Sequence, residues 1–188
     1  MRCWLAGIVF VAGCALTSKG EPRELRYFTI ETSNAAGAPA AGAGCGQVRL
    51  GRIIAGTYLE RAIERRISPV ELVPYDTLRW SEPPADYVRR AVTKAVFAHG
   101  IDQAVAGTAP VLELEVVAFE EIARGGGRVE LRYQLRDDHR VISRGAVSAE
   151  RAARGAGIDA TVVAIGEALA AASDDLAVRL GAASCPSG

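Results

Sequence analysis

The sequence lacks nearly every pattern that marks an enzyme. Its two histidines, His99 and His139, are far apart and neither stands in a metal-ligand spacing such as HExxH, so we expect both at the surface. The glycines at 125–127 are followed by Arg128, and not by the Lys-Ser or Lys-Thr of a phosphate-binding loop, so they predict a hairpin turn. A GxSxG frame is also missing. These absences argue against an ATPase and predict a protein with no catalytic residue, cofactor or metal.

Net charge is absent as well. The 22 Lys and Arg residues balance 22 Asp and Glu residues in a chain of 188 residues. A balanced chain has no global field that would attract nucleic acid or an anionic membrane. We therefore expect no nucleic-acid partner, and we expect any membrane contact to come from an attached lipid.

Cysteine is scarce, with four in the chain and no CxxC pair. Cys3 and Cys14 lie at the N-terminus, which leaves Cys45 and Cys185 as one distant pair. Their spacing does not fit a metal site. In an oxidising envelope compartment they can form one disulfide, or both can stay reduced, because each lies in a Gly- or Pro-flanked segment.

The N-terminus carries the most informative pattern. Arg2 and the amino group supply positive charge, an apolar run extends over 4–12, and Val11-Ala12-Gly13-Cys14 resembles the bacterial lipobox. The apolar run is too short to span a bilayer. The alternatives are an ordinary cleaved signal peptide or a buried N-terminal strand.

The lipobox interpretation divides the chain into three parts. It predicts a lipoprotein signal peptide over 1–13, a tether over 14–24 lipidated at Cys14, and one folded domain over 25–183. Ala15 carries no charge that would retain the protein at the inner membrane. The expected location is therefore the cell envelope, anchored by lipid to the outer membrane and facing the periplasm.

Periodicity in the rest of the chain predicts an α+β fold, with a mostly antiparallel sheet and helices packed on one face in a single domain. A stretch rich in Ala, Gly and Pro at 32–46 predicts a loop. The segment 57–67 is ambiguous, and its apolar spacing of four residues favours a helix. The expected strands are 25–31, 47–54, 70–75, 111–122, 129–136 and 140–150, and the expected helices are 83–99 and 159–180.

Several charged residues fall within these strands. The alternation of the last three strands, an antiparallel meander, places Glu113, Glu115, Arg132 and Arg136 on one face, which predicts a solvated face. Adjacent carboxylates at 120 and 121 would point to opposite faces of a strand, so they do not predict a catalytic dyad.

Five segments together resemble the ABC-type transport auxiliary lipoprotein family, which includes the paraquat-inducible protein C type, over nearly all of residues 25–181. Gly56-Thr57 departs from that family, in which a proline usually precedes the Tyr-Leu pair. The resemblance implies a strand at 62–67 in place of a helix, and we follow it there. The segments are Tyr58–Arg61, Leu78–Pro83, Leu112–Glu120, Val129–Leu135 and the final helix.

The same resemblance implies a function. Such proteins are envelope lipoproteins that work with an inner-membrane ABC transporter and a mammalian-cell-entry-type substrate-binding protein, and help move phospholipid or other apolar molecules between membranes. The expected function is a non-catalytic auxiliary component of this kind. A structural assembly lipoprotein of the outer membrane is the alternative, and a secreted hydrolase ranks third.

Tyr58, Leu59 and Trp80 are the candidate partner-binding residues, because they lie in the family-like segments and outside the clear core stripes. The opposing interpretation makes each of them a core residue, and Trp80 in particular an anchor between a strand and a helix. Exposure decides between the two interpretations.

Overall fold

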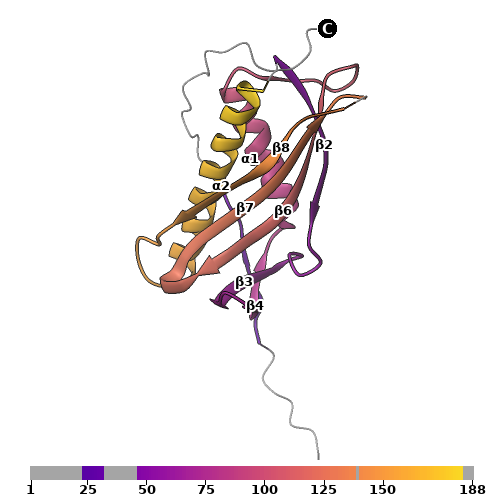
Figure 1. The fold of residues 1–188 in the computed structure, drawn as a ribbon. Helices are drawn as coiled ribbons and strands as arrows, with labels where there is room; N and C mark the ends of the chain where they lie inside the picture. The colour runs from indigo at the N-terminus through magenta and orange to yellow at the C-terminus, as the bar shows by residue number, and fades with distance from the viewer. Residues whose placement is uncertain (1–22, 32–45, 139, 184–188) are drawn as a thin grey trace, which may run out of the picture.

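The computed structural model describes residues 23–31, 46–138 and 140–183, and the fold is given for these residues. They form an eight-stranded sheet with two α-helices on one face (Figure 1). The elements are β1 (Arg26–Phe28), β2 (Gln47–Ala55), β3 (Ala62–Ser68), β4 (Glu71–Trp80), α1 (Pro84–Ala98), β5 (Asp102–Gln103), β6 (Val111–Ile122), the 3-10 turn Ala123–Gly125, β7 (Gly126–Arg136), β8 (Val141–Arg151) and α2 (Ile158–Gly181).

Some sequence predictions fall outside the described residues. These are the signal peptide over 1–13, most of the tether, Cys14, Cys45, Cys185 and His139. The predicted α+β fold, the single domain and the placement of both helices on one face are confirmed.

Strand β6 is the centre of the sheet. One of its edges pairs with β7 along its full length, and β8 continues from β7, so the antiparallel meander is confirmed. The other edge is shared by β2 and β3, which both run parallel to β6. Beyond β3 the sheet continues with β4 and then with β1, which is parallel to β4.

The sheet is therefore mixed, and the prediction of a mostly antiparallel sheet is wrong in that respect. The helix that the spacing over 57–67 favours is also absent, and β3 lies there, as the family resemblance implies. Ile63 of this strand is fully buried. Alternation along a strand reports which face is buried, but it carries no information on the direction of the neighbouring strand.

The core lies between the sheet and the helices. Alternate residues of β6 and β7 point into it, among them Leu112, Leu114, Leu131 and Leu135. Helix α2 packs across β7 and β8, while α1 lies beside α2 and contacts β2 and β6. The predicted apolar seam of α2 is confirmed, since Val162, Ile165, Leu169, Leu176 and Leu180 are all buried.

Gly127 sets the distance between α2 and the sheet. A Cβ atom built on this residue would lie 2.3 Å from the backbone nitrogen of Ile165 in α2. Gly125 just before it has φ +78°, which favours glycine and fits the predicted turn. The glycine run thus combines a turn with a site of close helix approach.

We predict that Gly127→Ala destabilises the protein by about 1–3 kcal/mol, because the added methyl group must push α2 away from the sheet. Gly46→Ala is the matched control, since a Cβ there meets no atom within 4 Å. Urea unfolding followed by circular dichroism measures both effects. Equal stability of the two variants would contradict the close packing at Gly127.

Candidate functional site

The candidate site lies where β2 passes into β3 along one edge of β6. The pairing of β2 ends with Ala55 opposite Val116, and the pairing of β3 begins with Glu64 opposite Glu120. The connecting segment 56–61 crosses the gap between these two pairs. It faces the part of β6 where the register with β7 shifts, between Val116 and Ala118.

Tyr58 closes this gap. Its hydroxyl donates a hydrogen bond of 2.6 Å to the carbonyl oxygen of Val117, the residue at the register shift. A bulge leaves a residue outside the regular ladder, so this carbonyl needs a donor from elsewhere. Burial raises the pKa of the Tyr58 hydroxyl, and the nearby Glu120 carboxylate raises it further. The hydroxyl therefore keeps its proton at neutral pH and remains a donor.

Gly56 makes room for the tyrosine ring. A Cβ atom at this position would lie 2.6 Å from the ring of Tyr58. The next turn is closed by the backbone N–H of Leu59, which donates to the carbonyl of Gly56 at 2.8 Å. The departure from the family pattern at Gly56 thus has a local physical reason.

Exposure separates the three predicted contact residues. Tyr58 is 45% exposed, whereas Leu59 is 2% exposed and Trp80 is fully buried. In this conformation Leu59 and Trp80 belong to the core, and their side chains present no surface to a partner. Tyr58 alone among the three lies at the surface.

Trp80 joins the end of β4 to α1 and β6. Its ring meets those of Tyr87 and Phe119 edge to face, with centroids 5.8 Å and 5.3 Å away. Aromatic pairs in this geometry add to the stabilisation from burial. The anchor interpretation of Trp80 is confirmed.

A buried carboxylate lies close to Tyr58. Glu120 is fully buried and accepts two hydrogen bonds from the guanidinium of Arg66, at 2.5 Å and 2.9 Å. Arg128 adds a longer contact of 3.5 Å. Glu121 instead accepts a hydrogen bond of 2.6 Å from the Tyr75 hydroxyl. The adjacent carboxylates therefore have separate partners and do not form a dyad.

The sequence did not indicate the role of Glu120. Its main partner, Arg66, is remote along the chain, and Arg128 fits the ordinary alternation of a strand. Arg66 lies 54 residues before Glu120. The one available signal was a charged residue inside an apolar strand, which needs a counter-ion when it is buried.

A hollow of about 570 Å³ opens beside Tyr58. Glu64 lies in its wall and is 5% exposed. Burial raises the pKa of the Glu64 carboxyl, and the negative charge of Glu120 raises it further. The other residues that line the hollow are Thr57, Glu60, Arg61, Ala62, Leu72, Pro74 and Arg79.

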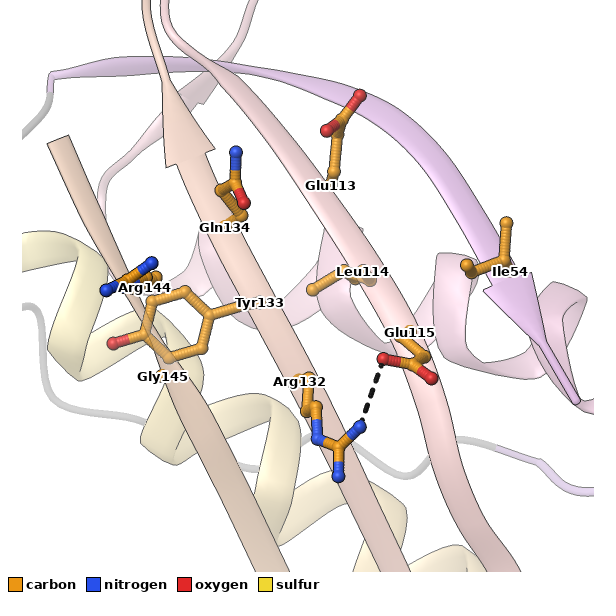
Figure 2. A pocket seen from close by; sticks show the side chains of 9 residues that line it. All are labelled: Ile54, Glu113, Leu114, Glu115, Arg132, Tyr133, Gln134, Arg144 and Gly145. Carbon is orange, nitrogen blue, oxygen red and sulfur yellow. Dashed lines mark hydrogen bonds and ion pairs between the residues drawn. The ribbon is translucent and has the colours of Figure 1, made fainter. Parts of the chain in front are cut away.

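A second, shallow groove of about 550 Å³ lies over the first half of β6 and the second half of β7 (Figure 2). Its charged residues form ion pairs across the strands, such as Arg132 with Glu115 at 3.5 Å. Arg136 pairs with Glu113 at 3.2 Å, at the rim of the groove. These side chains are half exposed, which confirms the predicted solvated face. Exposed pairs of this kind add little stability.

His99 differs from its prediction. It is 6% exposed rather than on the surface, and its Nε2 atom lies 3.0 Å from a carboxylate oxygen of Asp174. His99 caps the C-terminal end of α1 and Asp174 belongs to α2, so the contact ties the two helices together. The sequence did not indicate this because the two residues are 75 positions apart.

The described residues hold neither a metal-binding cluster nor a membrane-spanning helix. In 23–31, 46–138 and 140–183, no group of three or more His, Cys, Asp and Glu side chains is arranged to hold a metal ion. Within the same ranges no helix combines the length and apolar character needed to cross a membrane.

Comparison with known proteins gives a family match. Residues 28–177 match the model of the ABC-type transport auxiliary lipoprotein component. A search of curated proteins found no match.

Two solved structures share the fold. A crystal structure of a protein from Xanthomonas campestris has a TM-score of 0.70 and 21% identity, and the match covers 84% of this chain and 95% of that one. A crystal structure described only as that of an uncharacterized protein has a TM-score of 0.68 and 14% identity, covering 84% of this chain and 99% of that one. At these identities the likeness supports the fold alone.

We predict that Glu64→Gln stabilises the protein more at about pH 7.5 than at about pH 4. The raised pKa means that the folded state binds the Glu64 proton more tightly than the unfolded state does. Stability is therefore lost as the pH rises from the ordinary carboxyl pKa through the raised one, and glutamine removes this loss. Urea unfolding at both pH values measures the difference.

Glu60→Gln is the matched control, because Glu60 lines the same hollow but is exposed. Its effect on the free energy of unfolding should be small and the same at both pH values. A Glu64→Gln effect that is independent of pH would show that the carboxyl is not perturbed by burial.

Proposed function

This chain belongs to the ABC-type transport auxiliary lipoprotein family, and on that basis we propose that it is a non-catalytic envelope lipoprotein that assists an ABC transporter. The family match over residues 28–177 is the observation that carries the proposal. We further propose that the partners are the transporter and a mammalian-cell-entry-type substrate-binding protein, and that the cargo is phospholipid or another apolar molecule.

The chemistry of the site supports a binding role. Among the described residues, the buried carboxylate of Glu120 is neutralised by Arg66, and that of Glu121 accepts the hydroxyl of Tyr75. Carboxylates held in such pairs fix the positions of their neighbours, which suits a surface that binds a partner.

We propose Tyr58 as the centre of the partner contact. Its ring is 45% exposed, and its orientation is fixed by the hydrogen bond to Val117 and by the close approach to Gly56. A partly exposed tyrosine that is already ordered loses little conformational entropy on binding, which favours its use as a hot spot. Leu59, the next residue, is buried in the core, and its N–H donates to the carbonyl of Gly56.

The membrane anchor belongs to the same proposal. Lipidation of Cys14 would hold the domain at the outer membrane, facing the periplasm, with stable attachment requiring two or more acyl chains. Cys45 and Cys185 either form a disulfide or stay reduced, and thiol titration of the purified protein decides between the two states.

We predict that Tyr58→Asp lowers recovery of the transporter complex at least about tenfold, because a charge replaces an apolar hot spot. The experiment purifies the full-length tagged protein from detergent-solubilised membranes and measures the transporter and mammalian-cell-entry subunits by mass spectrometry. Val178→Asp is the matched control, since Val178 is 49% exposed and lies on α2.

Three outcomes distinguish the claims. Loss with Tyr58→Asp but not with Val178→Asp supports the contact surface. Equal recovery with both variants contradicts the surface and leaves the partners in place. Recovery of an outer-membrane barrel or of peptidoglycan alone, in the parent protein, would replace the transport role with the structural assembly role.

A further inference from the structure

The turn between β3 and β4 projects past the end of the sheet. Strand β6 ends at Ile122, and the last residue of β3 that pairs with it is Arg65, opposite Glu121. Residues Ile67–Glu71 extend beyond this point and are called the hairpin tip below. Figure 1 shows β3 and β4 at one end of the molecule.

The hairpin tip exposes apolar side chains. Val70 is 95% exposed and Ile67 is 50% exposed. Turns normally carry Gly, Asn, Asp or Ser at such positions, so a bare valine at the outermost point is unusual. A single exposed apolar side chain is ordinary, but two on one projecting tip offer a small apolar surface that a partner can cover.

The direction of the N-terminal chain identifies that partner. Strand β1 runs parallel to β4, with Arg26 opposite Leu78, so the chain before Arg26 heads toward the hairpin tip. Arg23 has already reached Asp76, with 2.7 Å between the guanidinium and the carboxylate. At Arg23, where the described chain begins, the chain therefore points toward the hairpin tip.

Chain length keeps the tip close to the membrane. Cys14 lies nine residues before Arg23, a segment that spans about 30 Å at most. The tip lies about 17 Å beyond Asp76, if β4 rises as an ordinary strand. A tether of this length allows the tip to reach the surface of the bilayer that holds the Cys14 lipid.

Charge near the tip does not favour an anionic partner. Arg23 pairs with Asp76 and Arg66 pairs with Glu120. Arg65 lies over the ring of Tyr75 at 5.1 Å, and Glu71 at the end of the tip offsets its charge. The contact must therefore depend on apolar burial.

We propose that the hairpin tip inserts Ile67 and Val70 into the interfacial layer of the bilayer that holds the Cys14 lipid. The insertion orients the domain, because two points of attachment, the lipid and the tip, fix it more tightly than a flexible tether alone. This inference rests on the proposed lipid anchor at Cys14.

The test uses a tryptophan at the tip as a depth probe. The mature lipidated protein carrying Val70→Trp is reconstituted into phosphatidylcholine vesicles with plain or brominated acyl chains, since bromine quenches tryptophan only inside the bilayer. Val105→Trp is the matched control, because Val105 is 93% exposed and precedes β6 at the opposite end of the sheet. Trp80 is fully buried, and the parent protein measures the constant fluorescence that Trp80 contributes to each variant.

We expect bromine to quench the Val70→Trp signal by about half and to leave Val105→Trp unchanged, with no change in high salt. Ile67→Trp repeats the measurement if Val70→Trp does not fold. Equal quenching at both ends, or none at the tip, overturns the proposal. If the emission maximum of the tip tryptophan changes with the number of protein molecules per vesicle, and bromine does not quench it, the tip contacts a second copy of the chain. That result also overturns the proposal.

Flotation separates this proposal from the anchor. The parent protein should float with the vesicles, whereas Cys14→Ser protein should remain in solution. If the parent protein does not float, the lipid anchor is wrong and the tip proposal falls with it. If it floats and the tip is not quenched, the anchor stands and the tip proposal alone is wrong.

Discussion

The ion pair between Arg66 and Glu120 is the buried charged contact between the β3–β4 hairpin and β6, and it acts together with the packing of Trp80 on Phe119. Strand β3 pairs with β6 through Glu64 and Arg65 alone, which is a short parallel contact. The Glu120 carboxylate is fully buried and takes both hydrogen bonds from one guanidinium. Removing one partner of such a pair costs about 3–5 kcal/mol, although the intact pair adds little net stability. The pair therefore specifies where the hairpin lies.

The position of the hairpin fixes the two surfaces that carry the functional proposals. At one end of β3 the segment 56–61 brings Tyr58 against the register shift in β6, and its hydroxyl satisfies the carbonyl of Val117. At the other end the hairpin tip projects beyond Ile122. One buried carboxylate thus supports a contact surface for a partner and a tip directed toward the anchored end of the chain.

Long elements with strong periodicity could be predicted from the sequence. The meander and the α2 seam followed from alternation and from apolar spacing, because both patterns report which side chains are buried. The spacing over 57–67 misled because Leu59 is buried in the core before β3 begins, whereas Ile67, near the end of β3, is half exposed. The parallel pairing of β2 and β3 with β6 could not be predicted, since strand direction depends on distant connections. For the candidate site, pattern selected Tyr58, Leu59 and Trp80 together, and only burial in the folded state could separate them.

Hydrogen exchange of the Arg66→Met protein tests most directly the claim that this ion pair holds the hairpin. Methionine leaves the Glu120 carboxylate without its main partner, so amides of residues 62–80 should exchange at least about tenfold faster, while those of α2 and β8 keep their rates. In the double variant Arg66→Met with Glu120→Leu, which removes the buried charge, the hairpin amides should return close to their original rates. Unchanged exchange in the single variant, or equal acceleration throughout the domain, would contradict the account.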